Sequence, residues 1–362
     1  MILGQRQGFS RDPQPCSLSF SSLSSPDRRP FYVFRPLRAT SATRAHGPHG
    51  KLATRTISWG MRNLAKHLPE SAGFDLKHLL VEPGKKISLG KDFDPKYTGG
   101  FKEKEGALEE LKLNVEWLAA EQDVLYAANA YSVLIVLQAL DAAGKDGTIK
   151  HVISGVNPQG CEVHSFKAPS QEELSHDYLW RAAYRLPQSG HIGIFNRSYY
   201  EEVLVVRVHP ELLAQQRLPT LGKDKSIWKR RFKEINSFER YLVDNGIIVL
   251  KFFLNISKEE QKTRFLKRIE EKEKNWKFSA GDIRERRYWD DYMKAYEEMF
   301  NQTSTDWAPW YVIPADHKWF TRLCVSEIII ATLKSLGLKY PKVSEQELAE
   351  LQKAKEELLK AK

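Results

Sequence analysis

A glycine and a lysine that follow an apolar run have the types and spacing of a phosphate-binding loop. Residues 131–137 are rich in β-branched and other apolar side chains, and residues 137–148 read Leu-Gln-Ala-Leu-Asp-Ala-Ala-Gly-Lys-Asp-Gly-Thr. In such a loop, backbone N–H groups and a helix N-terminus bind an anion, and the lysine, here Lys145, supplies a mobile charge. Two residues depart from the G-x-x-x-x-G-K-[ST] pattern, because Ala139 replaces the first glycine and Asp146 replaces the hydroxyl residue.

Asp141 is the unusual residue of this segment, because a carboxylate inside a phosphate site repels its ligand unless a cation lies between them. A bound Mg²⁺ removes this conflict, since it binds carboxylate and phosphate oxygens together. We predict a Mg²⁺ site at Asp141, with Mn²⁺ as an alternative metal. In the alternative interpretation the segment is only the start of a helix, with Asp141 as its cap and Lys145 in solvent. The predicted phosphate contacts of the loop are Ala142, Ala143, Gly144, Asp146, Gly147 and Thr148.

Hydrophobic periodicity indicates the elements that would hold this loop in place. Short apolar runs predict five strands, at residues 131–137, 161–166, 193–195, 247–254 and 310–313. Helical periodicity predicts helices at residues 102–121, 145–154, 171–184, 228–243, 258–274, 282–300 and 319–336. Strands that alternate with helices of this kind imply a parallel sheet covered on both faces. We therefore predict an α/β fold, with three α/β/α layers and a central, mostly parallel five-stranded sheet.

Four motifs, in order along the chain, resemble the family-2 polyphosphate kinases. They are Ala-Leu-Asp-Ala-Ala-Gly-Lys-Asp-Gly at 139–147, Gly-Val-Asn-Pro-Gln-Gly at 155–160, Gly-Ile-Phe-Asn-Arg-Ser-Tyr-Tyr-Glu at 193–201 and Trp-Lys-Phe-Ser at 276–279. The resemblance runs from about Asp92 to about Tyr340. It implies a P-loop kinase with a helical lid that moves phosphate between inorganic polyphosphate and nucleotides. The residues of the first and third motifs are similar to those of the branch of the family that accepts AMP as well as ADP.

The resemblance also implies roles for polar residues outside the loop. Asn196 stands where the family has an acidic metal ligand at the end of the second core strand, and its amide oxygen can join Asp141 at the metal without adding charge. Arg197 is expected to contact phosphate at the carboxyl edge of the sheet, where such folds bind ligands; its alternative is a surface ion pair. Arg181 and Asn196 are the expected nucleotide contacts.

Three arginines, Arg284, Arg286 and Arg287, lie in the lid expected around residues 276–305. Phosphoryl transfer passes through a loose transition state whose charge cations stabilise, so lid arginines suit catalysis. The resemblance favours Arg287 as the catalytic one, with Arg284 and Arg286 as phosphate contacts. The alternative is a solvated helix face. Candidates for a basic groove that would bind the polymer are Lys150, Lys229, Arg230, Arg231 and Lys251.

The net charge of +10 is concentrated near the N-terminus. Residues 1–60 hold nine basic and two acidic residues, together with nine serines and six prolines. We interpret them as a disordered or non-native leader before a true start at Met61, with an organelle transit peptide as the alternative. This charge therefore indicates no partner, and no nucleic acid is expected. Residues 61–340 are predicted to form the kinase domain and residues 341–362 a C-terminal surface helix.

Compartment and membrane association follow from apolar runs and cysteines. The longest apolar run, 131–137, is much shorter than the roughly 20 residues of a membrane-spanning helix, so no membrane partner is expected. Cys16, Cys161 and Cys324 lie far apart without a CxxC pair, which excludes a disulfide framework and a cysteine zinc site. We expect a reducing compartment, the cytoplasm.

The favoured function is a Mg²⁺-dependent, reversible transfer of the terminal phosphoryl group of polyphosphate to AMP or ADP, with ATP as a product or substrate. Lys145, Asp141, Arg197 and Arg287 would carry the reaction. Two alternatives stay open: a P-loop nucleotide kinase that uses ATP as donor, and a polyphosphate-binding protein without turnover. The resemblance further implies a homo-oligomer.

Overall fold

The structure, a computed structural model, describes residues 74–216, 218–219 and 226–361, all within one compact unit, His49–Lys362. The proposed leader at 1–60 and the proposed start at Met61 lie outside the described residues. Among the residues that are described, no helix combines the length and the apolar character needed to cross a membrane.

Six strands of the described chain form one sheet in the order β1-β6-β5-β2-β4-β3. Their bounds are β1 Leu80–Val81, β2 Ser132–Ala139, β3 Cys161–Ser165, β4 Ile192–Asn196, β5 Ile247–Asn255 and β6 Trp310–Pro314. The five predicted strands are present and pair in parallel, which confirms the mostly parallel α/β fold. The predicted count of five was wrong, because β1 adds an antiparallel edge strand beside β6. Two residues are too few to show a periodic pattern in a sequence.

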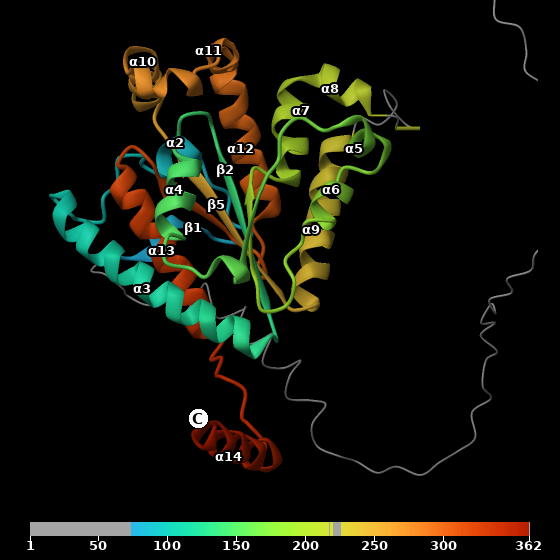
Figure 1. Ribbon diagram of the computed structural model, residues 1–362. Helices are drawn as coiled ribbons and strands as arrows, with labels where there is room; N and C mark the ends of the chain where they lie inside the picture. Colours follow the sequence, from blue (N-terminus) through green and yellow to red (C-terminus); the bar gives the residue numbers. More distant parts are fainter. Residues whose placement is uncertain (1–73, 217, 220–225, 362) are drawn as a thin grey trace, which may run out of the picture. The chain divides into compact units, whose positions relative to one another are not determined.

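Helices cover both faces of this sheet (Figure 1). On one face lie α3 Lys104–Ala128, α4 Lys145–Val152 and α13 Lys318–Ser335, which share a hydrophobic core with β2, β4, β5 and β6. On the other face lie α9 Ile227–Asp244 and α12 Trp289–Thr303. All eight residues of β2 are buried, as expected for a strand that has helices on both sides.

Three predicted helices are interrupted, and most of the remaining helices are short. The predicted helix 171–184 is two helices, α5 Gln171–Ser175 and α6 Trp180–Ala183. Between them the Asp177 carboxylate accepts a hydrogen bond from the Leu179 N–H, a local contact that competes with helix continuation. The other elements are η1 Leu76–Leu79, α2 Leu89–Asp92, η2 Pro158–Gly160, η3 Tyr199–Val203, α7 Val205–Val208, α8 Pro210–Gln215, α10 Lys258–Glu270, η4 Lys272–Lys277, α11 Ala280–Glu285, η5 Arg286–Tyr288 and α14 Glu345–Lys360.

The strand register brings the carboxyl ends of four parallel strands to one edge of the sheet. Leu137 of β2 lies opposite Asn196 of β4, and Asn255 of β5 lies opposite Pro314 of β6. The segments that leave these carboxyl ends therefore meet, as they do at the ligand-binding edge of open α/β sheets. The predicted phosphate loop leaves β2, which lies between β4 and β5.

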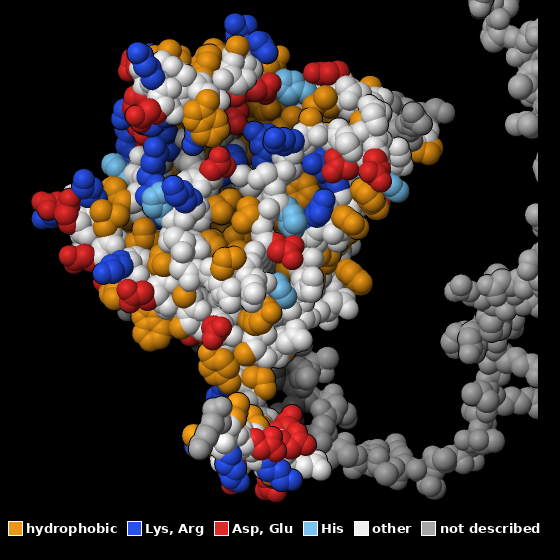
Figure 2. Space-filling view, in the orientation of Figure 1, with side chains coloured by type: hydrophobic (Ala, Val, Ile, Leu, Met, Phe, Trp, Pro, Cys, Tyr) orange, Lys and Arg blue, Asp and Glu red, His pale blue; other side chains and the backbone are white. Residues whose placement is uncertain are grey.

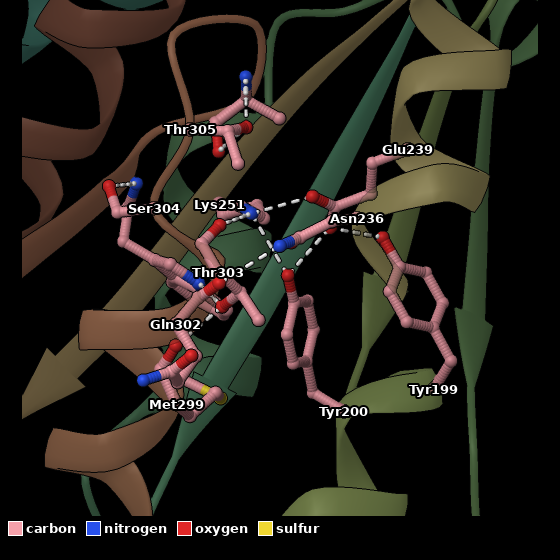
Figure 3. Close-up of polar contacts among 12 residues, drawn as sticks. Tyr199, Tyr200, Asn236, Glu239, Lys251, Met299, Gln302, Thr303, Ser304 and Thr305 are labelled. Atoms are coloured by element: carbon pink, nitrogen blue, oxygen red, sulfur yellow. Dashed lines mark hydrogen bonds and ion pairs between the residues drawn. The ribbon is translucent and has the colours of Figure 1, made fainter. Parts of the chain in front are cut away.

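A buried ion pair joins the sheet to the helices of the α9 face (Figure 3). Lys251 of β5 and Glu239 of α9 are both fully buried, with 2.7 Å between Nζ and Oε2. The ammonium also donates to the Tyr200 hydroxyl at 2.9 Å and to the Thr303 carbonyl at 2.7 Å, so all three of its donors have partners. The other carboxylate oxygen accepts from Tyr199 and Tyr200. Lys251 is therefore a structural residue, and its proposed place in a polyphosphate groove was wrong.

Breaking this pair should destabilise the protein strongly. Lys251→Met leaves the Glu239 carboxylate buried without its cation, and we expect the free energy of unfolding to fall by about 3–5 kcal/mol. Lys251→Met combined with Glu239→Gln removes both charges, keeps an acceptor for the tyrosine hydroxyls and should recover most of the loss. Urea denaturation of the three proteins checks this. A single variant that loses less than about 1 kcal/mol would contradict it.

Candidate active site

The turn between β2 and α4 has the backbone conformation of an anion-binding loop. Ala142 has φ 65° and Gly144 has φ 113°, so two residues of the turn are left-handed. Gly144 suits this conformation because it lacks a Cβ atom, whereas Ala142 adopts it at a cost of about 1 kcal/mol. α4 begins at Lys145, and the first N–H groups of a helix have no partner within the helix. The turn therefore presents backbone donors where an anion would bind.

A cavity of about 690 Å³ opens beside this loop and is lined by all of its residues from Asp141 to Thr148. Its walls carry ten basic side chains and two carboxylates, those of Asp141 and Asp146. The basic residues are Lys145, Lys167, Arg197, Arg264, Lys267, Arg268, Lys274, Lys277, Lys318 and Arg322. Figure 2 shows Lys and Arg side chains gathered between α4 and α10. Such a wall attracts a ligand with many negative charges.

Lys145 is held inside the loop rather than in solvent. Its Nζ donates a hydrogen bond to the Ala139 carbonyl at 2.9 Å. Burial lowers the pKa of Lys145 to about 8, and the nearby Arg197 lowers it as well, while Asp141 and other carboxylates partly oppose the change. Lys145 is thus charged at neutral pH, but this pH is close to its pKa.

Asp141 and Arg197 form an ion pair at the mouth of the loop. The distance between Asp141 Oδ1 and Arg197 Nη2 is 3.0 Å, and Arg197 Nη1 lies 3.5 Å from Glu201. Arg197 has φ 64°, a strained conformation for a residue with a side chain, and its N–H donates to the Leu137 carbonyl. The structure therefore brings together three predicted catalytic residues. Asp141 and Lys145 follow β2, and Arg197 follows the neighbouring strand β4.

Asn196 contacts the second carboxylate of the loop, not the first. Its Nδ2 donates to Asp146 Oδ1 at 2.8 Å. No group of three or more His, Cys, Asp or Glu side chains in the described chain could hold a metal by itself. Mg²⁺ does not need such a group, because it usually binds one or two carboxylates together with phosphate oxygens and water. Asp141 and Asp146, with the oxygen of Asn196, fit that requirement. The carboxylate of Asp146 suits a metal contact, because carboxylate and phosphate repel each other, whereas the phosphate contact predicted for this residue would use its backbone N–H.

The three arginines of the predicted lid are in different environments. Arg286 is half-buried, and its Nη1 donates to Gln261 Oε1 at 2.6 Å. It also lines a second, smaller cavity of about 40 Å³ together with Asp141 and Arg197. Arg284 and Arg287 are exposed and line neither cavity. The predicted helix breaks into α11, η5 and α12 at this point, so the structure brings Arg286, rather than Arg287, toward the loop.

Comparison with known proteins identifies the family. A family model described as Polyphosphate kinase 2 matches residues 101–340. The chain belongs to this family. A relative from Rhodopseudomonas palustris named ADP-polyphosphate phosphotransferase is 50% identical over 286 residues, which cover 78% of this chain and 98% of the relative. The AMP/ADP-polyphosphate phosphotransferase of Meiothermus ruber is 47% identical over 267 residues, covering 74% and 96%. The crystal structure of Polyphosphate Kinase 2 from Arthrobacter aurescens matches with a TM-score of 0.70 at 40% identity, covering 77% of this chain and 95% of that one.

In this polyphosphate kinase the cations of the cavity are mostly not those singled out from the sequence. Arg231 is buried, with its guanidinium 3.8 Å from the centre of the Tyr178 ring, and Lys150, Lys229 and Arg230 do not line the cavity. The cavity cations instead come largely from α10, η4 and α13. The spacing of Arg264, Lys267 and Arg268, and of Lys318 and Arg322, places each set on one helix face and is the sequence signal for them.

The predicted nucleotide contact Arg181 lies behind the cavity wall. Its Nη2 donates to the Lys167 carbonyl at 2.8 Å, its Nε lies 3.3 Å from Glu173, and its guanidinium lies 5.0 Å from the centre of the Phe166 ring. Phe166 and Lys167 line the cavity, whereas Arg181 does not. In this structure Arg181 supports the segment that forms the wall.

The pKa of Lys145 predicts a pH dependence of the reaction. The charged form predominates below about pH 8 and is lost as the pH rises through that value, so kcat/KM for polyphosphate should fall on the alkaline side of about pH 8. Bound phosphate favours the charged form, so the fall in kcat should occur at a higher pH. Initial rates between about pH 7 and about pH 10 measure both. The Lys145→Arg variant stays charged, so its rate should be lower but independent of pH over this range. A descending limb that persists in Lys145→Arg would assign the titration to another group.

Proposed function

We propose that the protein transfers the terminal phosphoryl group of inorganic polyphosphate to AMP or ADP, reversibly and with Mg²⁺ bound. The observation that carries this proposal is the cavity wall, with ten Lys and Arg side chains against two carboxylates around a P-loop. These cations extend from α4 through α10 and η4 to α13, more than a single nucleotide requires, and suit a polymer of phosphate. Two relatives support AMP and ADP as acceptors, because the name of the one from Rhodopseudomonas palustris refers to ADP and that of the one from Meiothermus ruber refers to AMP/ADP.

The side chains of the site suit phosphoryl transfer without a covalent intermediate. The transition state is loose, with charge on the equatorial oxygens of the transferring group, so the protein mainly positions the reactants and supplies positive charge. The loop N–H groups and Lys145 would bind those oxygens. Arg197 lies at the mouth of the same loop. It would stabilise negative charge on the transferring group from the side opposite the loop N–H groups and Lys145. The attacking oxygen belongs to the acceptor phosphate, so no protein nucleophile is needed.

Magnesium is the metal that fits the oxygen donors of the site. When bound, it would bring polyphosphate and nucleotide oxygens together and reduce their mutual repulsion. In this chain the carboxylates of Asp141 and Asp146 and the amide oxygen of Asn196 would hold it. Arg197 now pairs with Asp141 and would then share that carboxylate with the metal or turn fully to Glu201.

The cytoplasm is the proposed compartment, on the evidence of the cysteines. Cys161 and Cys324 are both free thiols. Burial raises the pKa of Cys161 to about 11 and raises that of Cys324 as well, so neither is a reactive thiolate at neutral pH. Such thiols suit a reducing environment.

A donor comparison tests the proposed reaction. With Mg²⁺ and polyphosphate as the sole donor, we expect AMP to give ADP and then ATP, and ADP to give ATP, because the cation-lined cavity accommodates the polymer. Nucleotide products are separated by chromatography, with AMP, ADP and GDP supplied in separate reactions. Turnover with ATP as donor but none with polyphosphate would favour the ordinary nucleotide kinase. Tight polyphosphate binding without any turnover would favour a binding protein.

Asp141→Asn tests the metal-binding role of the loop carboxylate. The amide keeps a hydrogen-bond acceptor for Arg197 but removes the charge that holds the cation, so we expect kcat to fall about 100-fold or more and the required Mg²⁺ concentration to rise. Polyphosphate binding should be retained or strengthened, because a negative charge leaves the cavity. Titrations with Mg²⁺ and with polyphosphate measure the two effects.

Asp244→Asn is the matched control for this substitution. Asp244 is an exposed residue of α9 that pairs with Arg240 of the same helix. Its substitution should leave both titrations unchanged. Normal turnover of Asp141→Asn at ordinary Mg²⁺ concentrations would remove Asp141 from the metal site.

A further inference from the structure

Two residues of α10 bind the P-loop through its backbone carbonyl groups. Gln261 Nε2 donates to the Asp141 carbonyl at 2.9 Å. Arg264 Nη1 donates to the carbonyls of Ala142 and Ala143 at 3.0 and 2.7 Å. Three consecutive carbonyls of the loop are thus held by one helix that follows β5, more than a hundred residues further along the chain.

We propose that Gln261 and Arg264 are positioning residues that hold the P-loop backbone in its phosphate-binding conformation, and that Gln261 connects this conformation to the lid through Arg286. The proposal rests on the assignment of the β2–α4 turn as the phosphate site of the enzyme.

The hydrogen bonds of Arg264 distinguish a positioning role from phosphate binding. Its side chain is almost fully buried, and it also donates to the carbonyls of Ala315 and Asp316 at 2.6 and 3.0 Å and, through Nε, to Glu260 at 2.7 Å. A guanidinium has five N–H donors, and all five have protein acceptors here. Although Arg264 lines the cavity, it could bind a phosphate only by giving up one of these bonds. It therefore joins α10, the P-loop and the β6–α13 connection.

The geometry of the peptide group explains why the carbonyls matter. A trans peptide directs its C=O and the following N–H in opposite directions. Holding the carbonyls of Asp141 and Ala143 against α10 therefore turns the N–H groups of Ala142 and Gly144 away from α10. The loop also contains the left-handed Ala142, a conformation that persists only where the surroundings support it. The bonds from Gln261 and Arg264 provide this support.

Gln261 also contacts the lid. Its Oε1 accepts from Arg286 Nη1 at 2.6 Å, while its Nε2 donates to Asp141. The amide orientation is determined by these partners, because the reversed amide would direct N–H groups at a guanidinium. Gln261 is buried, so both bonds are sheltered from water. A movement of Arg286 toward a phosphate would release Gln261 and loosen one anchor of the loop.

Arg264→Lys tests the positioning role, because lysine keeps the charge but cannot reach four carbonyls. In the substrate-free protein we expect amide hydrogen exchange of residues 140–148 to become at least about tenfold faster, which measures local opening. We expect kcat to fall about 10- to 100-fold, because misplaced donors lose transition-state contacts. A residue that supplied only charge would tolerate lysine. Arg240→Lys, an exposed substitution on α9, is the control and should change neither quantity.

Gln261→Glu provides a second test if Arg264→Lys destabilises the whole chain. The carboxylate can still accept from Arg286, but it cannot donate to the Asp141 carbonyl, so exchange should increase in residues 140–148 and remain unchanged around Arg286. Unchanged exchange of the loop in this variant, or in a folded Arg264→Lys, would overturn the proposal. Because exchange is measured without substrate, this outcome is independent of which phosphate donor the enzyme uses.

Discussion

A loop that binds an anion through its backbone needs a partner for every carbonyl it turns outward. In the β2–α4 turn that need is met from α10, where one amide and one guanidinium bind the carbonyls of Asp141, Ala142 and Ala143. Without these bonds the left-handed Ala142 would lack support, and the N–H groups of Ala142 and Gly144 would no longer be turned away from α10. The remaining parts of the site, the lysine, the carboxylates and the lid, are placed relative to this backbone.

The protein uses buried positive charge in two different ways. Lys251 donates to Glu239, to the Tyr200 hydroxyl and to the Thr303 carbonyl, so each of its donors has a partner. Lys145 donates to one carbonyl and lies on the wall of a cavity, and its pKa is lowered to about 8. A satisfied ammonium fixes the packing of α9 and α12 against the sheet, whereas an incompletely satisfied one is available to a phosphate. The difference lies in the surroundings, because the residue type is the same.

Each carboxylate of the loop is paired with a polar or basic side chain. Asp141 pairs with Arg197, and Asp146 accepts from Asn196, so the two loop carboxylates have different partners. The proposed divalent cation would bind these carboxylates together with phosphate oxygens. The smaller cavity near Arg286 adjoins Asp141 from the lid side, so the same carboxylate borders both the basic cavity and the lid.

The sequence by itself determined the elements whose signals are local. The five parallel strands and the family follow from continuous apolar runs and from motifs of neighbouring residues, and these predictions were confirmed. The phosphate-binding role of the loop after β2 stays a prediction. The six-stranded count was missed, because a two-residue edge strand exists only through its pairing with β6. The roles of the leader, the metal and the oligomeric state stay predictions.

Only the tertiary structure decided which charged residues share the site. Lys251 lies in the middle of β5 and is buried beside Glu239 of α9, whereas Lys318 begins α13 and lines the cavity. Arg286, not Arg287, contacts Gln261, and the helix predicted over residues 282–300 breaks at η5. Helical spacing predicts which side chains share a face, but the packing of one element against another determines what that face meets, and that depends on contacts between residues far apart in the chain.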